Sequence, residues 1–368
     1  MLSKAYSGNI IAPIADEKWS SDCVVEKFKI HGFHVYWGNG IIRSLYYTFF
    51  TIRKAIKIFR STERPDVIIS PNPLVTGLIA VFLARFINAK TVVEVNGNFE
   101  TAFAFGRTGK ANPELTERIK GIVSKIMISF VVRKASIVKL VYRNQLKPLG
   151  LNAEQHLQTV SFPNFVSVES FIHADSGDDR YILLLGYPWF LKGVDILIKA
   201  FKLVSGEFPA YRLRIVGWCP EGKEYYQDLA GNDPRISLED PVYYDDVIRL
   251  MTHCSLYVLA SRTDSSPRVL REAMASRKPI IASNIDGVPD LIVDGYNGLL
   301  FEKENVADLA AKIKYVLSNP DIADRLAENG LKYVQENLSE KMYFDNYTKL
   351  LARILPNHFQ HTSNHVAG

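Results

Sequence analysis

Short apolar runs alternate with longer amphipathic segments along most of the chain. In the first half, β-rich runs are found at residues 65–70, 91–95 and 136–141, and a helical pattern lies between the first two, at residues 74–86. In the second half, strand, helix and strand patterns follow at residues 181–186, 190–204 and 213–217. Strands that alternate with helices favour parallel sheets covered by helices. The pattern therefore predicts an α/β chain with two halves, separated by a Pro-, Gly- and Asp-containing linker at Pro163–Asp179.

Length and composition agree with a globular protein of two or three domains. The chain has 368 residues, of which 47% are hydrophobic and 23% charged. Its three cysteines, Cys23, Cys219 and Cys254, are far apart and lack metal-ligand spacing, so they are interpreted as reduced thiols. No signal peptide opens the sequence, and the apolar run from Leu74 to Ile87 is too short to span a bilayer. These features predict a cytoplasmic location.

The positive charge is concentrated in the first half. Residues 1–173 carry 22 Lys and Arg against 12 acids, whereas residues 174–368 carry 22 against 27. Lys and Arg alternate with aromatic residues from Ile41 to Arg60, and a second basic helix is predicted from Arg118 to Lys134. Two interpretations stay open: each helix buries an apolar face against the sheet, or the helices dock at the inner, anionic leaflet of a membrane. No motif for nucleic-acid binding accompanies the charge, so no nucleic-acid partner is expected.

The segment Ser261–Val293 carries the clearest chemical signal. It places two acids, Asp264 and Glu272, eight residues apart on either side of an SSP loop. A helix is predicted after the loop from apolar residues at helical spacing, namely Val269, Leu270, Ala273 and Met274. The amides at a helix start and the helix dipole suit a phosphate group. Two carboxylates beside such a site indicate a pocket for a nucleotide sugar.

This segment resembles the E-x7-E region of the retaining glycosyltransferases of family 4. The resemblance rests on the order acid, loop, VLREAMASRKPIIAS and the turn DGVPD, and it continues through DGYNGLLFEKENVADLAAKI. Asp264 stands where the family usually has Glu and is one methylene shorter. The resemblance implies the GT-B architecture, in which two facing Rossmann-like domains enclose the active site and a C-terminal helix crosses back to the first domain.

The resemblance implies domain limits as well. The expected acceptor-side domain covers residues 1–165, the donor-binding domain residues 174–340 and the crossover helix residues 341–356, with a disordered tail at 357–368. The start fits the family less well. Either residues 2–14 are the end of a helix and the second strand, so that a central strand is missing, or residues 9–14 are the first strand. The second alternative then requires a helix at 20–30 and a strand at 33–37. The first alternative is favoured, and it predicts a truncated or poorly stable chain.

Lys192 and Gly193 are the expected phosphate-binding residues of the loop after the strand at 181–186. A lysine beside a helix start can neutralise the diphosphate as the donor bond breaks. The family commonly has an Arg just after the strand, where this sequence has Tyr187. Arg262 or Arg268 is expected to supply the missing cation, although Arg268 is equally plausible as a plain surface residue.

The resemblance to the family implies different roles for Asp264 and Glu272. Glu272, expected in the first turn of its helix, matches the residue that binds the nucleotide ribose, and Asp264 matches the acid near the donor sugar. Backbone amides of the loop and helix start are expected to hold the sugar and diphosphate, at Ser265, Ser266 and Val269. Asp286 and Gly287 form the next turn, where turn formation explains them about as well as ligand contact. Nothing in the segment Glu239–Asp246 distinguishes uridine from guanosine.

Asn96 is the expected contribution of the first domain. Asn96-Gly97 follows a buried strand where the family often has His-Gly, and an Asn side chain hydrogen-bonds but does not titrate. Strand alternation places Glu94 on the same face as Asn96, whereas Glu100 is expected at the surface.

The sequence thus predicts a retaining glycosyltransferase of cell-surface polysaccharide assembly. Its expected partners are a UDP- or GDP-sugar and a glycan or lipid-linked acceptor, with an anionic membrane surface as a further partner. No cofactor and no metal are expected, because no Asp-x-Asp signature ends a strand. Two alternatives stay open. One is a catalytically impaired relative that serves as a binding or partner subunit, and the other is a nucleotide-sugar epimerase of the same architecture.

Overall fold

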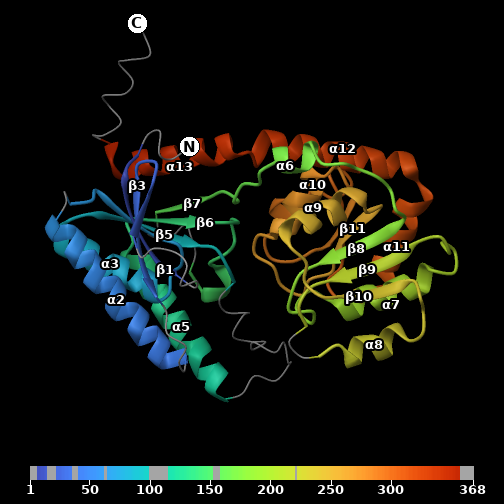
Figure 1. The fold of residues 1–368 in the computed structure, drawn as a ribbon, viewed down its shortest axis with the longest axis horizontal. Helices are drawn as coiled ribbons and strands as arrows, with labels where there is room; N and C mark the ends of the chain where they lie inside the picture. The colour runs from blue at the N-terminus through green and yellow to red at the C-terminus, as the bar shows by residue number, and fades with distance from the viewer. Residues whose placement is uncertain are drawn as a thin grey trace, which may run out of the picture.

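The computed structural model has two α/β lobes side by side, with a pair of helices running along one edge of both (Figure 1). It describes residues 6–14, 22–34, 40–61, 64–98, 115–151, 158–219 and 222–356. The predicted tail at 357–368 and Glu100 lie outside the described residues. No helix in these ranges has the length and hydropathy needed to cross a membrane.

The second lobe is built on a six-stranded parallel sheet. Its strands lie in the order β10-β9-β8-β11-β12-β13. Their bounds are β8 Tyr181–Leu185, β9 Arg212–Val216, β10 Ile236–Glu239, β11 Leu256–Leu259, β12 Ile280–Ser283 and β13 Leu299–Phe301. The helices between and after them are α7 Val194–Val204, α8 Glu224–Ala230, α9 Tyr244–His253, α10 Arg268–Ala275, α11 Val306–Ser318 and α12 Pro320–Asn337. Every residue of β8, β11 and β12 is buried, as expected for strands covered on both faces.

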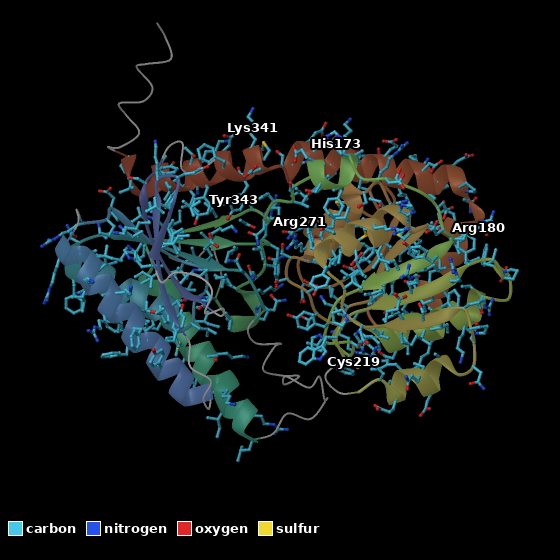
Figure 2. All side chains as sticks on the ribbon, in the orientation of Figure 1. His173, Arg180, Cys219, Arg271, Lys341 and Tyr343 are labelled. Carbon is cyan, nitrogen blue, oxygen red and sulfur yellow. The ribbon has the colours of Figure 1, made fainter. Side chains whose placement is uncertain are left out.

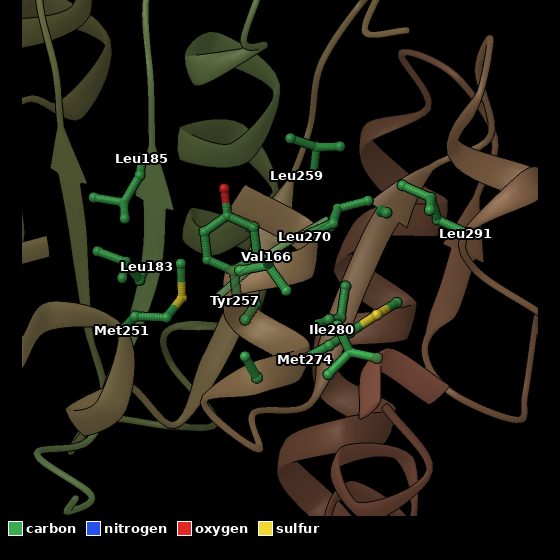
Figure 3. Packing of buried hydrophobic residues seen from close by; sticks show 14 of the residues in the cluster. Val166, Leu183, Leu185, Met251, Tyr257, Leu259, Leu270, Met274, Ile280 and Leu291 are labelled. Atoms are coloured by element: carbon green, nitrogen blue, oxygen red, sulfur yellow. The ribbon is translucent and has the colours of Figure 1, made fainter. Parts of the chain in front are cut away.

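Apolar side chains fill both faces of this sheet. On one face, Leu183, Tyr257 and Ile280 from three strands meet Leu270 and Met274 of α10 (Figure 3). The predicted linker contributes to the same core, because Val166, Val168 and Phe171 are buried there, the last of them in the short helix α6, Glu169–Ile172. The other face packs against α7 and α11. The core therefore fixes α7 and α10, the two helices whose first turns the sequence assigns to the candidate site.

The first lobe contains a four-stranded parallel sheet in the order β4-β5-β6-β7. Its strands are β4 Val67–Ser70, β5 Lys90–Val95, β6 Ile137–Leu140 and β7 Thr159–Ser161, and its helices are α2 Gly40–Ser61, α3 Val75–Ile87 and α5 Leu115–Lys134, with the turn η1 Lys147–Leu149. The last helix, α13, covers Glu340–Ile354 and packs Tyr347, Leu350 and Leu351 against Val92 and Ile137 of this sheet. The predicted crossover of the C-terminal helix is therefore confirmed (Figure 1).

The N-terminal segment forms a separate three-stranded sheet. Strand β1, Gly8–Ile14, pairs in parallel with β3, Phe28–His34, which pairs antiparallel with β2, Asp22–Val25. The helix at 20–30 in the second alternative for this region is therefore wrong. The β-branched pair Val24 and Val25 favours a strand, and Glu26 at φ 53° turns the chain directly into β3. Residues 2–5, the helix end of the first alternative, lie outside the described residues.

Candidate functional site

The carboxyl ends of the parallel strands of both lobes meet at one place. In the second lobe, β8 ends before Gly186, β11 before the 261–264 loop and β12 before Asp286. In the first lobe, Asn96 follows β5 and Tyr142 follows β6. Among the described residues of this junction, two hydrogen bonds join the lobes: Ser265 Oγ donates to the Asn96 carbonyl at 3.4 Å, and the Arg143 amide donates to Asp290 Oδ2 at 3.0 Å. Ligands of α/β sheets bind at strand carboxyl ends, so this junction is the candidate site.

Lys192 and Asp264 form an ion pair at the centre of the junction. Lys192 Nζ donates to Asp264 Oδ2 at 2.6 Å, and the two side chains are 19% and 13% exposed. The lysine stem runs over Gly186, where a Cβ would lie 3.0 Å from the lysine Cε. Gly186 thus leaves room for the lysine, which lies where an anionic ligand can exchange for the Asp264 carboxylate.

Gly193 sets the start of α7 against the end of β11. It caps the helix at φ 67°, a left-handed conformation that glycine adopts without strain. A Cβ at this position would collide with the carbonyl of Ala260. The close approach places the first amides of α7 beside Lys192, where the positive end of the helix dipole favours an anion.

Asp286 and Gly287 hold the loop that carries Asp264. Asp286 Oδ2 accepts hydrogen bonds from Thr263 Oγ1 at 2.6 Å and from the Asp264 amide at 2.9 Å. A Cβ on Gly287 would collide with the Ser265 carbonyl and with the Tyr142 ring of the other lobe. Both residues are therefore explained by loop positioning, and their predicted contact with the ligand stays a prediction.

The first turn of α10 points its amides into the junction. The helix begins at Arg268 after Pro267, so the amides of Arg268 and Val269 belong to the unpaired first turn. Arg271 Nη1 donates to Ser266 Oγ at 2.7 Å, which fixes the loop before the helix. Ser265 lies beside Asn96, as described above. The four predicted loop and helix residues, Ser265, Ser266, Arg268 and Val269, thus lie together at one helix start.

Glu272 lies in the second turn of α10, so its predicted place in the first turn is wrong. The helix begins four residues before it, at Arg268, because Pro267 can precede a helix without disrupting it. The carboxylate is 2% exposed and bonds to Arg268 Nε at 2.7 Å and to the Tyr244 hydroxyl at 3.1 Å. The Arg268 guanidinium also lies over the Tyr244 ring, 4.8 Å from its centroid. A ribose must therefore share Glu272 with these two side chains.

Arg262 does not supply the missing phosphate cation. It is 8% exposed, forms two hydrogen bonds of 2.9 Å with Asp195 and binds Glu304 at 2.7 Å. A buried arginine with two carboxylate partners is a structural cross-link, so this expectation is wrong. Tyr187, at the position of the family's Arg, is 61% exposed and contacts the Trp218 ring edge-on. Arg268, with its side chain 64% exposed, stays the predicted second cation.

Asn96 faces this loop from the first lobe. Its Nδ2 donates to Glu94 Oε2 at 2.8 Å and to the Pro71 carbonyl at 3.1 Å, so Glu94 and Asn96 do share a face. Glu94 also accepts from the Tyr347 hydroxyl at 2.7 Å, which ties the site to α13. Asn96 Oδ1 is buried without a hydrogen-bond partner. An unsatisfied buried acceptor next to the loop suits a ligand hydroxyl.

Sequence reasoning missed several side chains of the junction. Tyr142 donates to Asn98 Oδ1 at 2.9 Å and packs on the Gly287 turn. Arg271 lies at the side of the second lobe that faces the first (Figure 2). It is 3% exposed, burial lowers its pKa to about 10, and its Nε has no hydrogen-bond partner. The position of Tyr142 directly after a predicted strand was a usable signal. Arg271 gave none, because an arginine outside the apolar stripe of an amphipathic helix predicts only a solvent-facing residue.

A cavity of about 250 Å³ lies elsewhere in the second lobe, away from the junction. It is lined by Asp179, Tyr181, Arg214, Asp246, Arg249 and His253, among others.

Within the described ranges, no group of three or more His, Cys, Asp and Glu side chains is placed to hold a metal. The expectation of a metal-free site stays a prediction.

Solved structures of the same architecture show the fold. Sucrose-phosphate synthase from Thermosynechococcus elongatus superposes with a TM-score of 0.75 at 16% identity, covering 95% of this chain and 90% of that chain. Anabaena HepE, solved with UDP and glucose, gives a TM-score of 0.66 at 16% identity, covering 89% and 87%. The chain therefore has the GT-B fold of glycosyltransferases, two facing Rossmann-like domains with a C-terminal helix that crosses back.

Sequence comparison identifies the second lobe more closely. Residues 167–333, most of the second lobe, match the model of the family described as glycosyl transferases group 1. An uncharacterized glycosyltransferase of Methanocaldococcus jannaschii is 32% identical over 192 residues, which cover 51% of this chain and 52% of the relative. The capsular polysaccharide biosynthesis glycosyltransferase CapM of Staphylococcus aureus is 22% identical over 212 residues, covering 56% and 55%. The chain thus spans about half the length of the curated relatives it matches.

Proposed function

We propose that the protein is a retaining glycosyltransferase that moves a sugar from a UDP- or GDP-sugar to a glycan or lipid-linked acceptor. The observation that carries the proposal is the ion pair of Lys192 and Asp264 between the first turns of α7 and α10. One cation, one carboxylate and two helix starts converge there. This arrangement suits a diphosphate with a sugar attached to it.

Each side chain receives a role from its position. Lys192 leaves Asp264 when the donor binds and neutralises the diphosphate, whose charge grows as the glycosidic bond breaks. The first amides of α10 hold the phosphate oxygens, and the positive end of the α7 dipole adds to their attraction. Asp264, released from the lysine, accepts a hydrogen bond from a hydroxyl of the donor sugar. Its carboxylate lies one methylene further back than that of Glu, so the sugar must approach the loop more closely.

The acceptor side belongs to the first lobe. Asn96 Oδ1 has no partner in the structure and lies beside Ser265, so it can accept a hydrogen bond from the transferred sugar. Asn96 does not titrate near neutral pH, and the departing phosphate is then the base that deprotonates the acceptor hydroxyl. Glu272 binds the ribose after Arg268 and Tyr244 rearrange. The relative CapM is named for capsular polysaccharide biosynthesis, which supports a cell-surface glycan as the product.

The test is donor turnover with product stereochemistry. The protein is incubated with a panel of UDP- and GDP-sugars and with simple glycan acceptors, in buffer containing a chelator. Nucleotide release is measured, and the anomeric configuration of the product is read by NMR. The proposal expects release of one nucleotide and retention of configuration. Inversion contradicts the retaining mechanism, and strict dependence on added metal contradicts the metal-free site.

One alternative has a specific observation in its favour. Glu272 and Lys192 both have internal partners in the structure, and Tyr187 stands where the family has a cation. These features fit a relative that binds a nucleotide without turning it over. Tight nucleotide binding without release from any donor in the presence of acceptors identifies that role.

A further inference from the structure

Helix α5 is apolar on two opposite faces. Its inner face buries Ile128, Val131 and Val132 in the first lobe. The opposite face follows the i, i+3, i+4 spacing of one helical stripe and is exposed, with Leu115 at 73% and Ile126 at 66%. The exposed stripe consists of Leu115, Ile119, Ile122, Val123, Ile126 and Phe130. A helix that only packs onto its own domain normally has a polar outer face, so this stripe lacks an explanation in the fold.

The stripe continues onto the neighbouring helix α3. The rings of Phe82 and Phe130 stack with centroids 6.2 Å apart, and both side chains are exposed. Phe86, one turn further along α3, is 83% exposed. A Cβ on Gly77 of α3 would lie 2.9 Å from Val131, so the two helices pack closely. The exposed apolar residues of α3 and α5 therefore form one patch, larger than the scattered exposure usual for a soluble surface.

Helix α2 adds basic and apolar residues to the same side of the lobe. Phe49, Arg53, Ile56 and Arg60 are exposed and spaced four, three and four residues apart, so they share one helix face. Figure 1 shows α2, α3 and α5 together on the side of the first lobe opposite α13. These three helices define the surface that we call the α2–α3–α5 surface.

The charge of this surface is strongly positive. The three helices contain eleven Lys and Arg residues and one acid, Glu117. On α5, exposed basic side chains flank the apolar stripe, namely Arg118, Lys120, Arg133 and Lys134. Apolar side chains bordered by Lys and Arg fit the boundary between the acyl chains and the headgroups of a bilayer with anionic lipids.

We propose that the α2–α3–α5 surface docks the protein onto an anionic lipid bilayer. The positive charge of the surface favours an anionic bilayer over a second copy of the chain, because two copies that present the same surface would repel each other. The centre of the surface is α5 with α3. The sequence left two interpretations open for the basic helices predicted at 41–60 and 118–134: each buries one apolar face and solvates the other, or both dock at an anionic membrane. The exposed apolar stripe of α5 does not fit the first interpretation for this helix. The proposal is independent of donor chemistry, since vesicle binding needs no nucleotide.

The test measures binding of the full chain to vesicles of phosphatidylcholine with phosphatidylglycerol, and to vesicles of phosphatidylcholine alone. Arg118→Glu/Lys120→Glu alters the basic rim, and Ile119→Ser/Ile126→Ser alters the apolar stripe. The matched control, Leu203→Ser/Tyr315→Ser, removes exposed apolar side chains from α7 and α11 of the other lobe. All four side chains exchanged for Ser are exposed, and thermal melts check that each variant folds.

We expect binding only to the anionic vesicles, weakened by added salt. The charge-reversal variant should bind at least about 25-fold more weakly, since each basic residue near the surface contributes about a fivefold gain. The apolar variant should bind the anionic vesicles about tenfold more weakly than the wild type, and the control should bind like the wild type. Equal binding to both vesicles, no vesicle binding, or unchanged binding of folded variants would overturn the proposal. So would an apolar variant that changes only the oligomeric state in vesicle-free solution, which would assign the stripe to a protein partner.

Discussion

Exchange of Lys192 for Met is expected to weaken binding of the nucleoside diphosphate without unfolding the protein. Lys192 Nζ lies 2.6 Å from Asp264 and is partly exposed, so the freed Asp264 carboxylate keeps contact with water. A hydrogen bond to a charged group contributes about 1.5–3 kcal/mol. Loss of the lysine should therefore raise the Kd for UDP or GDP by about 10- to 150-fold. The Kd for the nucleoside alone should stay unchanged, because the nucleoside has no phosphate for Lys192 to contact.

The assay is isothermal titration of UDP, GDP and the corresponding nucleosides into each variant. Lys199→Met is the matched control, because Lys199 is exposed on the same helix, α7, outside its first turn. Its Kd for UDP should match that of the wild type. The reasoning is refuted if Lys192→Met binds UDP as tightly as the wild type does. It is also refuted if the Kd for the nucleoside rises by the same factor as the Kd for UDP, since the defect then lies in the fold of the pocket and not in phosphate recognition.

Three further variants test other parts of the account. Glu272→Gln keeps the side-chain volume but removes the charge, so UDP affinity should fall by about 1.5–3 kcal/mol in a titration while the melting temperature changes little; an unchanged affinity would argue against ribose binding. Gly287→Ala should lower stability by about 1–3 kcal/mol in a urea titration, because its Cβ meets the Ser265 carbonyl, whereas Gly206→Ala has open space and should be neutral. Burial raises the pKa of the Cys254 thiol to about 12 from an ordinary value of 9.0, so it should react with Ellman's reagent at pH 8 only after unfolding. The free energy of unfolding should accordingly fall as the pH rises from 9 towards 12, because the unfolded thiol loses its proton first, and Cys254→Ala should lack this part of the pH dependence.

The periodicity of the sequence predicts the second lobe well and the beginning of the chain poorly. Continuous apolar runs such as Tyr181–Leu185 become fully buried strands, because helices cover both faces of the sheet. The stretch at 20–30 is short and its apolar residues suit a helix or a strand equally. A two-residue turn at Glu26 and pairing with β1 decide between the two, and neither is visible in hydrophobic spacing.

In the candidate site too, some residues were predictable from the local sequence and others were not. Lys192, Asp264, Ser265 and Asn96 were predicted from a motif and from strand ends, and the structure brings them together, although their roles stay predictions. Arg262 was assigned wrongly, because its partners Asp195 and Glu304 are 67 and 42 residues away along the chain. Long-range ion pairs of this kind follow from packing and leave no local pattern.

The exposed apolar stripe of the first lobe could not be predicted from the sequence for another reason. Basic and aromatic residues at 41–60 left membrane docking as one of two interpretations for that helix, yet the larger exposed apolar stripe lies on α5. A helical pattern apolar on two faces does not reveal from sequence which face is inside. Only the packing of Val131 against α3 assigns the inner face and leaves Ile122 and Ile126 outside.

Hydrogen–deuterium exchange with and without saturating UDP tests the central claim most directly. The account places the diphosphate between the first turns of α7 and α10, so amide exchange should slow in segments 187–196 and 262–272. Exchange in α5 should stay unchanged. Protection confined to the cavity lined by Arg214 and Arg249, or no protection anywhere at a UDP concentration that saturates the protein, would contradict a donor site at the junction of the two lobes.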